Sequence, residues 1–225
     1  MLRGSSCIAT AIHSGCKDLI PIGSIEGALT LTQQLGRKSV LLCGEQNGRK
    51  IEGFDLGISP CEYRPEVVAG QVLILAATNG SGAIARTSFS RLSLIASFLN
   101  ASSVSCQASR SGGNVAIVCS GKEGGFSLED MVCGGLIITR LAQYQEESPI
   151  ELNDAAIAAQ VLYERYADSI LHMLQASHYG QYLMQMGFQH DLEACAQTDA
   201  LEVVPTLIEG HIAPAPGRGV RPHRV

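Results

Sequence analysis

Short apolar runs alternate with amphipathic stretches along most of the chain. The runs cover residues 18–22, 39–43, 71–76, 92–96 and 115–119, and a further one lies at 203–205. Each is the length of a strand and is rich in β-branched residues or leucine. Such alternation is typical of α/β proteins, in which helices flank a largely parallel sheet. We therefore predict one α/β domain whose strands follow these runs.

Polar residues at the ends of the amphipathic stretches mark the predicted helices. Ser24 and Gly36 are suited to begin and end one helix, and Ser127 precedes another that reaches Leu141. Residues 3–6 form a predicted turn before a helix at residues 7–12.

The longest predicted helix begins at Asn153 and extends to Ser177, with Gly180 as its stop. Its expected core stripe consists of Ile157, Val161, Ile170 and Leu174. Proline, glycine and arginine dominate from His211 onward, so we expect a domain over residues 1–210 and a flexible tail over 211–225.

Composition and charge narrow the class of protein. The chain has 225 residues, of which 46% are hydrophobic and only 16% charged, and this favours one substantial core over disorder. Its net charge is −5 and it has no basic stripe, which argues against a nucleic-acid partner. No apolar run is long enough to span a membrane, no secretory signal is visible, and the eight cysteines are dispersed. We expect a cytoplasmic protein with reduced thiols and no membrane partner.

Polar, glycine-rich loops follow four of the predicted strands, at residues 44–48, 78–82, 97–100 and 120–125. If these strands are parallel, the loops meet at one edge of the sheet, where open α/β sheets bind ligands. Helix N-termini at that edge suit phosphate, because their amides are free and partly positive. We expect a site for a small phosphorylated anion there.

Two patterns point to other chemistry. Residues 80–85 fit G-x-G-x-x-A, which leaves a nucleotide-binding oxidoreductase as an alternative, although no acid follows the next strand to bind a ribose. Cys119 precedes a glycine-rich loop as in cysteine phosphatases. However, Gly125 stands where the phosphate-binding arginine is required, so we interpret Cys119 as a buried thiol.

The stretch GEQNGRKIEGFDLGISP at residues 44–60 resembles the G-E-R-x-G…G-F-D-x-G-N-S-P signature of the 2-phosphosulfolactate phosphatase (ComB) family. The resemblance continues at residues 78–80, 97–101, 121, 126–130, 187–199 and 204–205, and it covers roughly residues 1–210. It implies a three-layer α/β/α fold with a mixed sheet. It also implies Mg²⁺-dependent hydrolysis of a phosphate monoester, 2-phosphosulfolactate, to sulfolactate in a route to coenzyme M.

The resemblance and the predicted loops together give a candidate site. The expected catalytic residues are Glu45, Asp55 and Glu129, and the expected Mg²⁺ ligands are Glu45, Asp55 and Asp130. The expected phosphate-binding residues are Arg3, Ser5, Ser6, Thr78, Asn79, Gly80, Asn100 and Gly121. The sequence leaves open whether the chain forms a homo-oligomer.

This chain departs from the family pattern at several positions. Met1 stands where the family has the end of a strand that finishes in Asp, so we expect that strand to be missing. Gln46, Gly82 and Gly125 stand where relatives commonly carry arginine, which weakens bidentate binding of phosphate or sulfonate. A catalytically impaired homologue that binds a small anion is therefore a second alternative.

Overall fold

The computed structural model describes residues 2–76, 78–87, 89–122, 124–144 and 149–215. Within these ranges the strands form one mixed sheet in the order β3-β2-β4-β1-β7-β6-β5. Strands β1, β2 and β4 are parallel, whereas β3, β5, β6 and β7 join in antiparallel pairs. The strands are β1 (Asp18–Ile22), β2 (Val40–Gln46), β3 (Arg49–Lys50), β4 (Val72–Ala76), β5 (Ser93–Leu94), β6 (Pro205–Ile208) and β7 (His211–Pro214).

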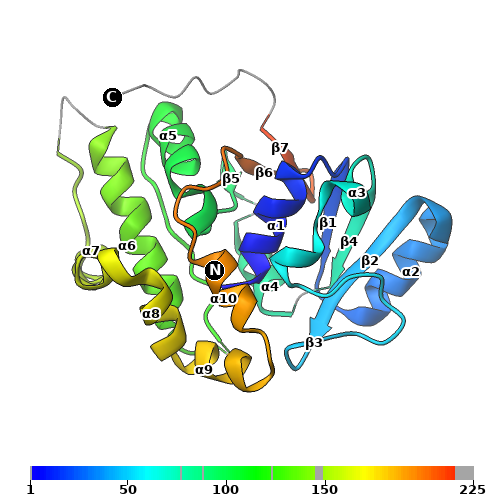
Figure 1. Ribbon diagram of the computed structural model, residues 1–225. Helices are drawn as coiled ribbons and strands as arrows, with labels where there is room; N and C mark the ends of the chain where they lie inside the picture. The colour runs from blue at the N-terminus through cyan, green and yellow to red at the C-terminus, as the bar shows by residue number, and fades with distance from the viewer. Residues whose placement is uncertain (1, 77, 88, 123, 145–148, 216–225) are drawn as a thin grey trace.

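Helices surround this sheet (Figure 1). The α-helices are α1 (Gly4–His13), α2 (Ile25–Leu35), α3 (Pro65–Val68), α4 (Thr78–Arg86), α5 (Ala101–Ser111), α6 (Leu128–Gln143), α7 (Asp154–Tyr166), α8 (Ile170–Ala176), α9 (His178–Gln185) and α10 (Gln189–Cys195). Short 3₁₀ turns lie at Arg37–Ser39, Pro60–Glu62, Phe98–Asn100 and Ala167–Ser169. None of the helices in the described ranges is long and apolar enough to cross a membrane.

Strand β4 is buried on both faces, and its alternate side chains enter different cores. In β4, Leu73 and Leu75 pack in the cluster that contains Ile8 of α1, whereas Ile74 packs with Ala28 of α2. Period-two alternation with apolar residues on both faces requires helices on both sides of the sheet. Figure 1 shows α1 and α3 on the viewer's side of β1 and β4. The predicted three-layer α/β/α fold is confirmed.

A third core lies among α5, α6, α8, α9 and α10. Its buried centre includes Leu136 of α6, Leu174 of α8 and Leu183 of α9. In Figure 1, α5, α6, α8 and α9 lie toward the left and α2 lies at the far right, with α10 and α1 between them. The N-terminal end of α1 therefore meets both the sheet and the helical part.

The predicted helix caps are confirmed by hydrogen bonds. The side chains of Ser24, Ser127 and Asn153 accept from the backbone N–H groups three residues later. These contacts satisfy amides that have no partner inside the helix, which explains why the caps are readable from the sequence.

Three predicted elements differ from the structure. Residues 115–119 form no strand; Val115 and Val118 are exposed, and Ile117 packs against the helical core instead. The predicted strand at 92–96 shortens to β5. The helix expected over 153–177 is interrupted at Ala167–Ser169, because its second half turns into the core formed with α9 and α10.

Single residues and the start of the predicted tail also differ. Ile157 and Val161, expected in the core stripe, are 48% and 59% exposed, whereas Ile170 and Leu174 are buried as predicted. Gly180, the expected helix stop, lies inside α9, where its N–H donates to the Ser177 cap. Residues 211–214, which the sequence assigns to the tail, form β7, while residues 216–225 lie outside the described ranges.

Candidate functional site

A cavity of about 770 Å³ opens at the edge where the parallel strands end. Pro21, Glu45 and Leu75 reach it from β1, β2 and β4. Its walls come from segments far apart in the sequence and include Gly4, Ser5, Gly48, Gly80, Gly121, Lys122, Glu129, Asp130, Tyr179 and Tyr182. The convergence of loops at the carboxyl edge of the sheet agrees with the position expected for a ligand site in this architecture.

Arg3 lies behind one wall of the cavity and is 1% exposed. Its guanidinium donates to Asp191 at 3.2 Å, to Glu45 at 3.1 Å and to the carbonyl oxygen of Gly48 at 3.0 Å. It also lies 4.6 Å from the ring centroid of Phe188. Because two carboxylates compensate this buried charge, Arg3 is held in place and in turn fixes the direction of Glu45.

Asp191 completes this network from α10. Its second carboxylate oxygen accepts from the hydroxyl of Ser59 at 2.5 Å. Arg3 therefore links the start of α1, the end of β2 and α10, which are distant in the sequence. Neither Asp191 nor Ser59 is among the predicted site residues, and a pairing across such a separation leaves no local signal.

Glu129 and Asp130 lie in the first turn of α6, directly after its cap Ser127. Asp130 accepts from the N–H of Gly121 at 2.9 Å. Burial opposes the charged form, but interactions that include the hydrogen bonds from Gly121 and Ser127 hold the pKa of Asp130 below its ordinary value. Gly121, a predicted phosphate-binding residue, thus already uses its N–H within the protein.

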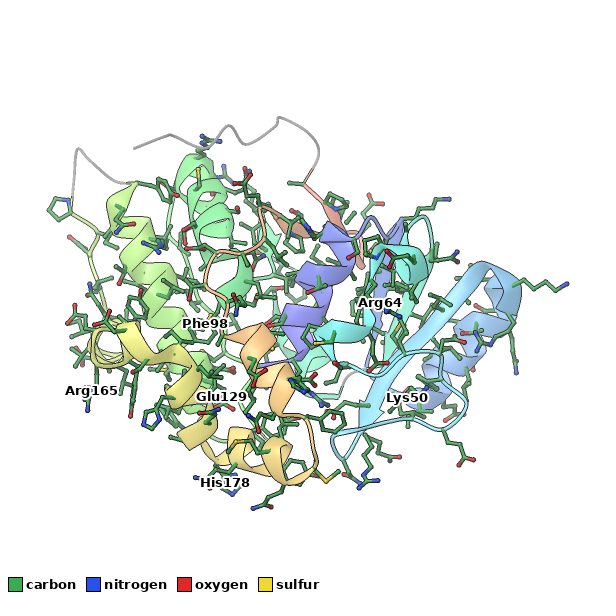
Figure 2. The ribbon with its side chains drawn as sticks, in the orientation of Figure 1. Lys50, Arg64, Phe98, Glu129, Arg165 and His178 are labelled. Carbon is green, nitrogen blue, oxygen red and sulfur yellow. The ribbon has the colours of Figure 1, made fainter. Side chains whose placement is uncertain are left out.

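Glu129 has a different environment. It is 5% exposed and lines the cavity, near the middle of the molecule in the view of Figure 2. Among the described residues its carboxylate makes no hydrogen bond and no ion pair. The side chain is buried, but its carboxylate oxygens reach the open space of the cavity and are available to a ligand.

Some predicted residues lie away from the cavity. Asp55 accepts from Arg37 at 2.7 and 2.9 Å and from the N–H of Leu42 at 2.7 Å, and it does not line the cavity. Partial burial works against the charged form of Asp55, but the hydrogen bonds from Arg37 and Leu42 hold its pKa below the ordinary value. Asn100 is fully buried and bonds to backbone atoms of Ile95 and Val203.

Of the remaining predicted phosphate-binding residues, some line the cavity and others do not. Ser5 and Gly80 line the cavity, whereas Ser6 is buried within α1. Thr78 and Asn79 lie in the first turn of α4, and their side chains are outside what the structure describes. The predicted residues therefore divide between the wall of this cavity and the interior of the fold.

The predicted metal set of Glu45, Asp55 and Asp130 is not brought together. In the part of the chain that the structure describes, no three His, Cys, Asp or Glu side chains lie close enough to hold a metal ion. Mg²⁺ usually needs only one or two protein carboxylates, with waters and substrate phosphate as its other ligands. Glu45 and Glu129 both line the cavity, so two carboxylates are available there for such an ion, although Glu45 also accepts from Arg3.

Comparison with known proteins identifies the relatives of this chain. The family model described as 2-phosphosulpholactate phosphatase matches residues 1–210. The chain belongs to the 2-phosphosulpholactate phosphatase family. A protein of Clostridium acetobutylicum named "Probable 2-phosphosulfolactate phosphatase" is 38% identical over 94% of this chain and 88% of its own length. Proteins of the same name from Thermotoga petrophila and Caldanaerobacter subterraneus are 37% and 34% identical, each over 93% of this chain and over 87% and 86% of their own lengths.

Segments that carry the resemblance to the 2-phosphosulpholactate phosphatase family meet at the cavity. Glu45 and Gly48 come from residues 44–60, Gly80 from 78–80, and Glu129 with Asp130 from 126–130. These segments belong to different elements of the fold. Their meeting at one cavity gives the family motifs a shared location.

Proposed function

We propose that this chain hydrolyses 2-phosphosulfolactate to sulfolactate and phosphate in the cavity at the strand edge, with Mg²⁺ held by Glu45 and Glu129. Membership of the family makes the chain a phosphoric monoester hydrolase. The observation that carries the finer proposal is the unpaired carboxylate that the buried side chain of Glu129 presents to the cavity where the family motifs meet. Coenzyme M biosynthesis and a cytoplasmic location stay predictions from the resemblance and the composition.

The charges of the cavity support a metal requirement. Glu45, Glu129 and Asp130 line it together with Arg86 and Lys122, so a phosphoryl group placed at Glu45 and Glu129 would lie beside two carboxylates. Arg3 offsets the charge of Glu45 only from behind the wall. Mg²⁺, when bound, neutralises phosphoryl oxygens and stabilises the leaving oxygen.

The protein itself would orient the phosphoryl group. Gly80 lies in the first turn of α4, where helix amides have no acceptor within the helix. The start of α1 at Gly4 and Ser5 adds a partial positive charge to the same cavity. Arg3 contributes by fixing Glu45. The terminal nitrogens of its guanidinium donate to Glu45, Asp191 and Gly48, while its buried Nε has no partner among the described residues.

Phosphate release from 2-phosphosulfolactate tests the proposal. We expect EDTA to abolish turnover and added Mg²⁺ to restore it. Glu129→Gln and Glu45→Gln should each lower kcat about a hundredfold or more, because lost electrostatic stabilisation of this kind costs ~3–4 kcal/mol. The matched control is Glu66→Gln, which removes an exposed carboxylate of α3 and should leave kcat unchanged.

Full activity after chelation would refute the metal assignment. Normal kcat in Glu129→Gln would remove Glu129 from the site. A chain that binds sulfolactate and never releases phosphate would instead be the impaired homologue. Saturable NAD(H) binding, measured by melting temperature, would favour the oxidoreductase alternative.

A further inference from the structure

Lys122 occupies a constrained position in the wall of the cavity. It lies in a turn in which its carbonyl oxygen accepts from the N–H of Gly125 at 2.8 Å. The preceding Gly121 has φ = +64°, and a Cβ there would collide with the carbonyl oxygen of Gly125. The turn is tied to α6 by the hydrogen bond from Gly121 N–H to Asp130. The backbone therefore fixes the point from which the Lys122 side chain extends.

Two tyrosines of α9 fix the other end of that side chain. The ammonium lies 5.2 Å from the ring centroid of Tyr179 and 5.3 Å from that of Tyr182. The two rings are stacked at 6.0 Å, as their i, i+3 spacing on a helix allows. Aromatic faces attract a cation at this range but do not neutralise it.

The tyrosines are themselves held. Tyr182 donates its hydroxyl to the carbonyl oxygen of Asn47 at 2.9 Å, and a Cβ on Gly48 would approach its ring to 3.1 Å. Burial, with the nearby carboxylate of Glu45, raises the pKa of Tyr179 to about 12, so this phenol is uncharged at neutral pH. Lys122 thus faces two aromatic rings, of which that of Tyr182 rests against the tip of the β2–β3 hairpin.

The charge of Lys122 is left available to a ligand. No carboxylate within the described residues forms an ion pair with Lys122. Arg86 also lines the cavity, from the last turn of α4. Lys122 differs because it lies over the ring of Tyr179, which lines the cavity together with Glu45 and Glu129. An uncompensated cation beside the expected reaction centre suits an anionic group of the substrate.

We propose that Lys122, held by Tyr179 and Tyr182, binds the second acidic group of the substrate, a carboxylate or a sulfonate, apart from the phosphoryl group. This inference rests on the proposed function for the identity of the substrate. It deepens that function, because it assigns specificity for a polyanionic monoester to one residue. A simple phosphate monoester has no group for Lys122 to bind.

Kinetics with two substrates test this role. Lys122→Met keeps the length of the side chain and removes its charge. We expect it to raise KM for 2-phosphosulfolactate about 10–100-fold, the range for a lost charge-assisted hydrogen bond, with kcat little changed. Turnover of ethyl phosphate, which has no second acid, should be unaffected. Lys122→Arg should restore most of the affinity, and Lys38→Met, which removes an exposed cation outside the cavity, is the matched control.

Equilibrium binding separates this inference from the proposed function. Sulfolactate, which lacks the phosphoryl group, should bind the unchanged chain in calorimetry and lose about 10–100-fold affinity in Lys122→Met. Lactate has the carboxylate but not the sulfonate. It should therefore bind more weakly to Lys122→Met only if the carboxylate is the group that Lys122 binds. Absence of turnover would refute the proposed function and leave this test intact. Equal sulfolactate affinity in both chains, or none in either, would overturn the role of Lys122; Lys122→Gln replaces the Met variant if that variant fails to fold.

Discussion

The carboxylate of Asp55 joins the loop after β3 to the beginning of β2. It accepts two hydrogen bonds from Arg37 and one from the N–H of Leu42. We predict that Asp55→Asn leaves kcat nearly intact and lowers the free energy of unfolding by about 1–2 kcal/mol, because a charge-assisted pair and a backbone contact weaken. Urea unfolding and kcat measured on the same preparation check this. A hundredfold loss of kcat with unchanged stability would return Asp55 to the reaction.

The same carboxylate gives that loss of stability a definite pH dependence. The folded pKa of Asp55 lies below its ordinary value, so its contribution is complete above the unfolded pKa, near 4. As the pH falls through the folded pKa, the folded state must also take up the proton and the contribution disappears. The stability difference between Asp55→Asn and the unchanged chain should therefore be constant near pH 7 and vanish in the acid range.

Cys119 gives a second prediction for a single residue. Burial, with the negative charge of Asp130, raises the pKa of its thiol, so it is protonated at neutral pH. We predict that Cys119→Ser retains most of the phosphatase activity with a modest stability cost. An assay of folded protein decides this, and complete loss of turnover would identify a nucleophile.

Residue roles were predictable from the sequence where they are local. Ser24, Ser127 and Asn153 cap helices through contacts within three residues, and each was identified correctly. Arg3 and Asp191 are 188 positions apart, so their pairing depends on the whole fold. Asp55 belongs to a family motif, but its ion pair with Arg37 could not be predicted from that motif.

Helices α6 and α7 pack unusually closely at one point. A Cβ on Gly135 would collide with the carbonyl oxygen of Ala159 and lie 2.6 Å from the Cβ of Tyr163. On the neighbouring Gly134 it would meet only Ile117, at 3.7 Å. These adjacent glycines of α6 form a matched pair for mutation.

We predict opposite effects at these two positions. Gly135→Ala should destabilise the fold by about 1–3 kcal/mol, because α7 must move away. Gly134→Ala should be neutral or stabilise by up to ~1 kcal/mol through helix propensity. Thermal melting of both variants measures the difference, and equal melting temperatures would contradict the close approach of the two helices.

Elements were predictable where pattern and environment agree. β2 and β4 are apolar runs buried for most of their length, and β1, half-buried apart from Leu19, pairs with β4; all three lie where predicted. Residues 115–119 have the same composition, yet they pack beside α6 as irregular chain, since a strand needs a free neighbouring edge as well as propensity. The break at Ala167–Ser169 depends on packing with distant helices, which periodicity does not describe.

At the scale of the whole molecule, the sheet is built from both ends of the chain. β7 pairs antiparallel with β1 through Leu19 and Ile212, and β6 connects β7 to β5. We predict that a chain ending at residue 204 aggregates on expression, because one edge of β1 is left without a partner. Size-exclusion chromatography measures this, and a monodisperse, folded product would contradict it.

Because of this topology, the two parts of the sheet are synthesised at different times during translation. The parallel strands β1, β2 and β4 leave the ribosome early, whereas β6 and β7 follow only after the helices α5 to α10. During most of synthesis, the edge of β1 that will pair with β7 therefore has no partner. Folding intermediates with such an exposed strand edge are prone to aggregate. The folding yield of this protein should consequently depend on the speed of elongation and on chaperones that shield β1 until its last neighbour arrives.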